Sequence, residues 1–97
     1  MEFDWDPAKS EANLSKHGIS FEEARTVFDG PILTWVDDRR DYGEDRHISL
    51  GALSPSAVLI VIHTERGDKI RLISARKANR RERKVYHDYL AQAKESD

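Results

Sequence analysis

Arginine and lysine are concentrated in one short segment of the chain. Residues 66–84 contain nine cationic side chains and two carboxylates, whereas residues 1–65 contain six cations and thirteen carboxylates. The formal net charge of -2 over 97 residues therefore conceals a strongly basic segment. Clustered guanidinium groups bind phosphate oxygens through paired hydrogen bonds and attract polyanions. The segment predicts a phosphate-binding surface, with an acidic protein partner or a merely solvated face as the alternatives.

Other kinds of chemistry have little support in the sequence. The chain has no cysteine, which excludes disulfides, thiolate zinc sites and a cysteine nucleophile, and which fits a reducing cytoplasm. Asp37, Asp38 and Asp41 lack the spacing of a calcium loop, and no serine stands in a nucleophile elbow. We therefore expect neither a metal ion nor a cofactor. Because the sequence shows no secretory signal and no long apolar run, we expect a cytoplasmic protein that does not bind membranes.

Local signals predict two helices near the N-terminus. Asp6 and Pro7 have the residue types of an N-cap and a first helical position, and Gly18 is typical of a helix end. Ser20 and Glu23 have the spacing of a capping box, which predicts a second helix that ends at the following Asp-Gly-Pro sequence.

The middle of the chain has the alternating pattern of strands joined by short turns, which indicates antiparallel hairpins. One strand is apolar on both faces, so we expect it to be central. The prediction is a single α+β domain over residues 1–97, with two N-terminal helices, a mostly antiparallel sheet of about four strands and a C-terminal helix. The strands are expected at residues 32–36, 46–53, 57–63 (the apolar one) and 69–75, after a short edge strand or extended arm at residues 2–5.

The terminal helix is predicted over residues 76–93. On a helical wheel, Arg76 and Arg80 share a face that points away from the apolar arc. Glu82 falls inside that arc, where a carboxylate is costly unless it is paired, so we expect an arginine from the sheet or from the helix to bind it. The apolar arc comprises Ala78, Val85, Tyr89 and Ala93, with Tyr86 at its margin.

Three segments in order along the chain resemble a known family: WDPAKSEANLSKHGISFEEARTVF, GEDRHISLG and RLISARKANRRERKVY. The sequence resembles the BrnT ribonuclease toxins of bacterial type II toxin–antitoxin systems, whose fold is similar to that of the RelE family. The resemblance implies a toxin that inhibits translation by cutting RNA and that is neutralised by a cognate antitoxin from the adjacent gene. It further implies a ribbon-helix-helix antitoxin, through which alone the complex would bind operator DNA, and it allows for a toxin dimer within the complex.

A metal-independent ribonuclease of this kind needs cations around the phosphate and groups that transfer protons during attack by the 2′-hydroxyl. We expect phosphate clamping and stabilisation of the transition state by Arg71, Arg76 and Arg80. The candidates for proton transfer are His17, His47 and Glu44, although a single histidine is more often a surface or packing residue.

Further cations are expected to contact RNA outside the catalytic centre. Trp5 and Trp35 have the residue type that stacks on bases, but at least one of them is expected in the core. The alternative to an enzyme is a noncatalytic module in which residues 66–84 dock on nucleic acid or on an acidic protein. The expected RNA-binding residues are Lys9, Lys16, Arg46, Lys77, Arg83 and Lys84.

Overall fold

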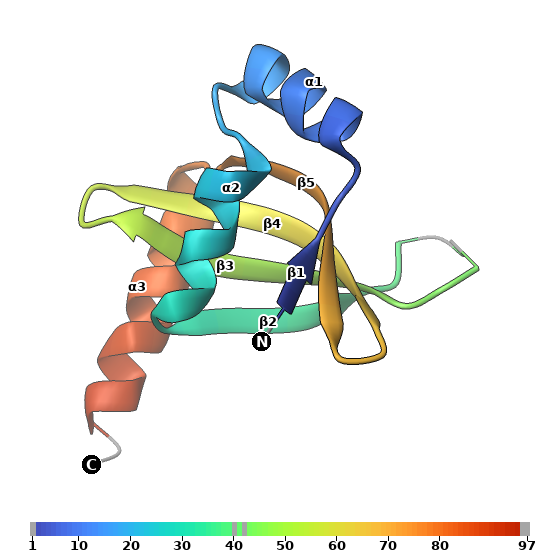
Figure 1. Cartoon of the computed structure of the whole chain (residues 1–97). Helices are drawn as coiled ribbons and strands as arrows, with labels where there is room; N and C mark the ends of the chain where they lie inside the picture. Colours follow the sequence, from blue (N-terminus) through green and yellow to red (C-terminus); the bar gives the residue numbers. More distant parts are fainter. Residues whose placement is uncertain (1, 40, 42, 96–97) are drawn as a thin grey trace.

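The described part of the chain folds into a five-stranded sheet with helices on both faces (Figure 1). The computed structural model describes residues 2–39, 41 and 43–95; Arg40 and Tyr42, in the polar stretch between the strands predicted at residues 32–36 and 46–53, lie outside the described residues. The predicted α+β class is confirmed. In chain order the elements are β1 (Glu2–Asp4), α1 (Pro7–His17), α2 (Phe21–Ala24), the 3-10 helix η1 (Arg25–Asp29), β2 (Ile32–Asp37), β3 (Arg46–Ser54), β4 (Ala57–Arg66), β5 (Lys69–Lys77) and α3 (Arg80–Glu95).

The strands are arranged in the order β1-β5-β4-β3-β2. β1 runs parallel to β5, whereas the other neighbouring strands are antiparallel. β4 lies in the middle of the sheet, as its apolar sequence predicted. The sequence predicted about four strands, and the additional one is β1, which pairs with β5 as an edge strand rather than extending as a free arm.

The N-terminal helices begin and end at the predicted capping residues. The Asp6 carboxylate accepts a hydrogen bond from the Ala8 backbone N–H, and Gly18 ends α1 with a φ of 74°, a left-handed conformation that favours glycine. The capping box of Ser20 and Glu23 is present at the start of α2. α2 has only four residues before it tightens into η1, so the second predicted helix is part α-helix and part 3-10 helix.

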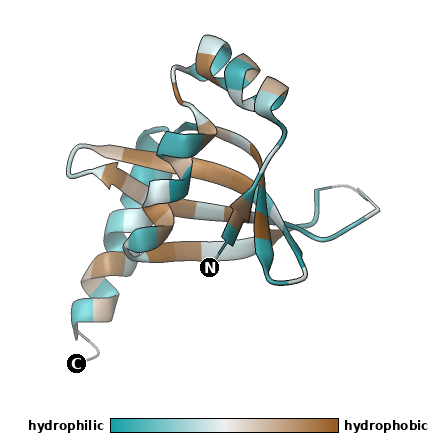
Figure 2. Ribbon diagram, in the orientation of Figure 1, coloured by the Kyte–Doolittle hydropathy of each residue, from teal (hydrophilic) through white to brown (hydrophobic). Residues whose placement is uncertain are grey.

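The sheet separates two apolar layers. Leu59 and Val61 of β4 face α2 and η1, where Phe21 is fully buried. The alternate residues Val58 and Ile60 face the other way, into a cluster that contains residues of α3. Figure 2 shows that the apolar residues concentrate along the central strands. None of the described helices is long and apolar enough to cross a membrane.

Asn13 fastens α1 to the end of β5. Its side-chain amide donates hydrogen bonds to the carbonyls of Ile19 and Ala75, both at 2.8 Å, and its oxygen accepts one from the Ala75 N–H at 3.2 Å. Asn13 is 7% exposed, so this polar side chain is buried with its hydrogen-bonding capacity used. The contact fixes the C-terminal end of α1 next to the strand that carries Arg76.

The sequence predicted that the terminal helix begins at Arg76, but in the structure it begins at Arg80. β5 continues to Lys77, and Arg76 pairs in the sheet with Ile60 of β4. Asn79 then caps the helix, because its side-chain oxygen accepts from the Glu82 N–H while the Glu82 carboxylate accepts from the Asn79 N–H, both at 2.8 Å. Arg76 and Arg80 therefore lie on different elements, and the prediction that they share a helix face was wrong.

The side of α3 that packs on the sheet also differs from the predicted arc. Tyr86 is 1% exposed and donates a hydrogen bond from its hydroxyl to the Pro31 carbonyl at 2.7 Å. Leu90 packs in the same cluster, whereas Val85 is 45% exposed. Of the predicted arc, Ala78 is buried in this cluster but precedes α3, whereas Val85 is not buried. The packed side of α3 includes Tyr86 instead, because its large ring occupies the space over the sheet and its hydroxyl finds a partner there.

Candidate active site

A cavity of about 220 Å³ lies on the face of the sheet that α3 covers. Its apolar lining includes Ile48, Ile60 and Ile62, which come from β3 and β4. The polar and aromatic residues that line it come from four different parts of the chain: His17, Trp35, Arg39, Ser74, Arg76 and Glu82.

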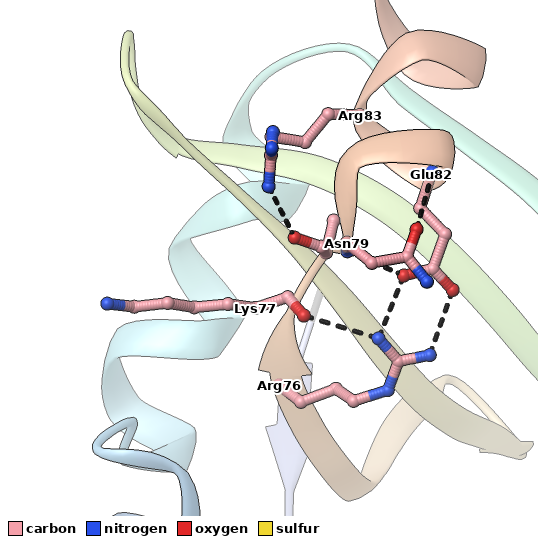
Figure 3. A network of polar contacts seen from close by, with 6 residues as sticks. Arg76, Lys77, Asn79, Glu82 and Arg83 are labelled. Carbon is pink, nitrogen blue, oxygen red and sulfur yellow. Dashed lines mark hydrogen bonds and ion pairs between the residues drawn. The ribbon is translucent and has the colours of Figure 1, made fainter.

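Arg76 and Glu82 form a bidentate ion pair at the cavity (Figure 3). The two guanidinium nitrogens Nη1 and Nη2 lie 2.8 and 2.9 Å from the carboxylate oxygens Oε1 and Oε2. Hydrogen bonding to Arg76 lowers the pKa of Glu82, and the same bond raises the pKa of Arg76. Both groups are therefore charged at neutral pH. The predicted pairing of Glu82 with an arginine is confirmed, and of the two predicted sources, sheet or helix, it is the sheet that supplies the arginine.

Arg39 is a second cation at the cavity, and the sequence prediction missed it. It follows β2, and its Nε and Nη2 atoms donate to the Asp37 carboxylate at 2.7 and 2.8 Å. The Asp37 side chain is 1% exposed, whereas the Arg39 side chain is 68% exposed. A buried carboxylate thus holds an exposed guanidinium at the cavity. The signal for this pair in the sequence was an aspartate at a strand end, followed two residues later by an arginine.

His17 is the one predicted proton-transfer residue that lines this cavity. It is the last residue of α1 and is half-buried, between the Asn13 anchor and Gly18. Trp35, on β2, is 41% exposed and also lines the cavity, whereas Trp5 packs edge-on against Phe21 in the core. One tryptophan is therefore in the core, as predicted, and the other is accessible to a planar ligand.

The remaining predicted catalytic residues do not line the cavity. Arg71 pairs with Asp4 of β1 at 2.7 Å and lowers the pKa of that carboxyl group through the hydrogen bond. Arg80 is the first residue of α3. Glu44 lies in the loop before β3 and contacts Arg66 at 3.4 Å.

His47 lies on the opposite face of the sheet, in a separate polar cluster. Its ring stacks on that of His63, with centroids 5.6 Å apart. His63 Nε2 lies 2.7 Å from Ser49 Oγ, which lies 2.7 Å from Thr34 Oγ1. Burial, followed by the charge of His47, lowers the pKa of His63 to about 4, so this imidazole is neutral at pH 7.

The predicted RNA-binding residues are spread over several surfaces. Figure 3 shows Lys77 on the other side of β5 from Arg76, consistent with its pairing with Leu59, a residue of the opposite core layer. Arg83 donates to the Ala78 carbonyl at 2.9 Å, and Lys84 pairs with Asp88 at 2.8 Å. The others are Lys9 and Lys16, exposed on α1, and Arg46, half-buried at the start of β3.

Among the residues that the structure describes, no group of three or more histidine, aspartate or glutamate side chains is placed to hold a metal ion. The charged or titratable side chains that line the cavity are two guanidinium groups, a carboxylate and an imidazole. Guanidinium groups supply charge to a phosphate, and an imidazole transfers protons near neutral pH. The arrangement suits a reaction at a phosphodiester.

Comparisons with known proteins identify the class to which this chain belongs. A family of ribonuclease toxins of type II toxin–antitoxin systems matches residues 5–82, and the chain belongs to that class. The family is BrnT. The 1.1 Å crystal structure of the ribonuclease toxin BrnT of Brucella abortus has a similar fold, with a TM-score of 0.62 and 24% sequence identity over 82% of this chain and 99% of that chain. No curated protein matches the chain significantly.

Proposed function

We propose that this protein is an endoribonuclease toxin that cuts RNA at the cavity between α1, β5 and α3 without a metal ion. The observation that carries the proposal is the convergence of Arg39, Arg76 and His17 on one cavity in a member of a ribonuclease toxin family. These three residues are far apart in the sequence, and each is held by its own contact or helix end.

In the proposed reaction the 2′-hydroxyl oxygen attacks the neighbouring phosphorus while the bond to the 5′-oxygen breaks. The products are a 2′,3′-cyclic phosphate and a 5′-hydroxyl. Arg39 and Arg76 neutralise the charge that develops on the phosphoryl oxygens, a contribution that is large when the cations are held in place beforehand. Glu82 holds Arg76, and the exposed face of Trp35 stacks on a base.

We assign proton transfer to His17, because His47 and Glu44 do not line the cavity. The neutral imidazole accepts the proton of the 2′-hydroxyl, and the imidazolium then protonates the 5′-oxygen that leaves. Lys16 precedes His17 and Arg80 follows the cap of α3, so we propose that both bind phosphates on either side of the scissile bond.

The test is cleavage of RNA in the presence of EDTA by wild-type protein and by two arginine variants. Arg76→Gln is expected to lower the cleavage rate by about 100- to 1,000-fold, as does loss of one preorganised donor in other enzymes. Arg71→Gln is the matched control, because Arg71 lies on the same strand and also pairs with a carboxylate, but does not line the cavity. Circular dichroism checks that both variants fold.

The RNA is incubated with wild-type protein under conditions that permit binding. If it stays intact, the hypothesis of a ribonuclease is rejected and that of a noncatalytic binding module is favoured. Equal losses in the two variants would reject the proposed cavity. In either case RNA binding is expected to weaken with salt, with a logarithmic slope of about -0.7 per phosphate contacted. Products that carry a 2′,3′-cyclic phosphate would support attack by the 2′-hydroxyl.

We further propose that cleavage inhibits translation and that the antitoxin suppresses it. Membership of a type II toxin–antitoxin family implies an antitoxin partner and an RNA substrate. The proposed antitoxin is of the ribbon-helix-helix type and carries the complex to operator DNA. Co-purification with the product of the adjacent gene tests the pairing, and restored protein synthesis in the presence of that product tests the suppression.

A further inference from the structure

The two edges of the described sheet are protected to different degrees. At one edge, β1 has three residues, and its carboxylates Glu2 and Asp4 pair with cations of β5. A short, charged edge strand of this kind resists pairing with another chain. At the other edge, β2 has six residues, and residues 32–36 contain no charge, no proline and no glycine. Its register against β3 has no bulge, so β2 lacks the features that protect an edge strand.

β2 also exposes apolar surface on both faces of the sheet. Trp35 is 41% exposed on the face that α3 covers, and Val36, the next residue, is 54% exposed on the opposite face. β2 is the last strand on this side, so its outer backbone groups have no neighbouring strand in the described part of the chain. An apolar edge of this kind is a template for the addition of a further strand.

We propose that the toxin forms a symmetric dimer in which the β2 strands of two copies pair antiparallel and join the two sheets into one. A two-fold axis perpendicular to the sheet relates the copies and passes beside Thr34. Antiparallel pairing about this axis places Thr34 opposite the partner's Thr34. Ile32 then lies opposite the partner's Val36, and Leu33 lies opposite the partner's Trp35.

The sequence of β2 matches itself in this register. Residues directly opposite each other in an antiparallel pair lie on the same face, where β-branched pairs, aromatic pairs with aliphatic residues, and threonine pairs are favourable. The proposed register forms one pairing of each kind. An axis at Trp35 would instead place Leu33 opposite the partner's Asp37, and an axis at Leu33 would place Trp35 opposite the partner's Pro31. The same surface must match itself in a two-fold contact, and this strand does so best about Thr34.

A second copy fits this edge better than other partners do. Pairing residues 32–36 with themselves brings no like charges together, because none of these residues is charged. Since β1 is protected, each copy has one open edge, and the contact closes as a dimer without growing into a filament. RNA gains its binding energy from cations, which this segment lacks. A strand of the antitoxin would have to supply a matching sequence that a second copy already carries.

α3 adds contact area that the two strands alone do not provide. Paired strands about 20 Å long bury too little surface for the roughly 1,200 Å² of a stable interface. The last turns of α3 extend past β2 (Figure 1), where Tyr89 and Ala93 line a hollow together with Pro31. The two-fold axis keeps α3 on the same face in both copies and brings Pro31 level with the partner's Asp37. The last turns of α3 therefore lie over the partner's β2, beside the partner's Trp35.

The dimer would also shape the proposed active cavity. Trp35 lines that cavity, and in the dimer it lies against Leu33 and the last turns of α3 of the partner. Each copy then completes one wall of the other copy's cavity, next to the side chain that stacks on a base. This consequence rests on the proposed ribonuclease function, whereas the dimer itself does not.

The first experiment is sedimentation velocity of the purified toxin over a range of concentrations. The wild type is expected to sediment as a dimer. Val36→Lys places an ammonium group opposite the partner's Ile32 and is expected to weaken the dimer by about tenfold or more. Leu14→Lys is the matched control, because Leu14 is 47% exposed on α1, which is anchored to β5 at a distance from the β2 edge. Circular dichroism checks that both variants fold.

The second experiment tests the register by cross-linking. The chain has no cysteine, so a single introduced cysteine has no other thiol to react with inside one copy. Opposite Cα atoms in an antiparallel pair are about 4.5–5.5 Å apart, a distance within the range of a disulfide. Thr34→Cys, a change of similar size, is expected to form a covalent dimer on mild oxidation, seen on a nonreducing gel. Leu33→Cys, which lies opposite the partner's Trp35, is expected to remain uncross-linked, as is Leu14→Cys.

A wild-type toxin that sediments as a monomer at every concentration would overturn the proposal. So would an equal weakening of the dimer in Val36→Lys and Leu14→Lys, or the absence of a cross-link in folded Thr34→Cys. If Val36→Lys kept the dimer but lost affinity for the antitoxin or for a fluorescent single-stranded RNA, the edge would belong to that partner instead. Neither experiment measures cleavage, so a dimeric toxin that leaves RNA intact would refute the ribonuclease and retain the dimer.

Discussion

The buried imidazole of His63 predicts a specific loss of stability in acid. His63 is 3% exposed, and its neighbours are the Ser49 hydroxyl, the Phe28 ring and the stacked His47 ring. Its pKa is about 4, whereas an ordinary histidine has a value of 6.5. Between these two pH values the unfolded chain binds a proton that the folded protein does not bind. The contribution of the neutral His63 imidazole to stability is therefore fully present above pH 6.5 and is lost as the pH falls through this window.

The size of the effect follows from the difference between the two pKa values. A separation from 6.5 to about 4 corresponds to a loss of about 3 kcal/mol in the free energy of unfolding between pH 7 and pH 4. The assay is urea denaturation at several pH values for the wild type and for His63→Gln. The variant is expected to lack this part of the pH dependence, while the acid sensitivity that arises from Asp4 and Glu82 is common to both proteins.

The control is His87→Gln, because His87 is exposed on α3. It should keep the pH dependence of the wild type. The reasoning would be refuted if His63→Gln and the wild type lost stability in parallel between pH 7 and pH 4. An NMR titration that placed the pKa of His63 near 6.5 would refute it equally.

Two further substitutions test how α1 and η1 are packed on the sheet. Asn13→Ala removes three hydrogen bonds and leaves the buried backbone groups of Ala75 without a side-chain partner, so we expect a loss of about 3 kcal/mol by urea denaturation; a loss below about 1 kcal/mol would contradict the anchoring role. Gly51→Ala places a Cβ atom 2.8 Å from the Cβ of Val27, so overpacking is expected to cost about 1–3 kcal/mol and to lower the melting temperature. An unchanged melting temperature would show that η1 moves away freely.

Local signals predicted the N-terminal helices well. The contacts of Asp6, Gly18, Ser20 and Glu23 span only a few residues, so residue type and spacing are enough to place them. The start of α3 was missed because β5 is extended by its pairing with β4, which no local pattern reveals. The spacing of Asn79 and Glu82 was nevertheless a capping signal, and reading it would have placed the helix correctly.

The candidate cavity was only partly predictable. Arg76 and His17 were both proposed from residue type, but nothing in their spacing predicted that α1 and β5 would bring them to one cavity. That proximity depends on the buried side chain of Asn13, whose role requires knowledge of the tertiary fold. Arg39 was overlooked because recognising it as a site residue requires knowing that Asp37 is buried. Burial at a strand end is a property of the whole sheet and not of the local sequence.

The double engagement of the Glu82 carboxylate has a consequence for genetics. The Glu82 side chain takes part in the cap of α3 and also binds Arg76 at the cavity. Replacing it therefore weakens the start of the helix and removes the contact that holds Arg76 in place. Among cells selected for survival of toxin expression, we therefore expect Glu82 substitutions that impair folding as well as Glu82 substitutions that abolish the proposed cleavage of RNA. Helical content, measured for each recovered allele, separates the two origins.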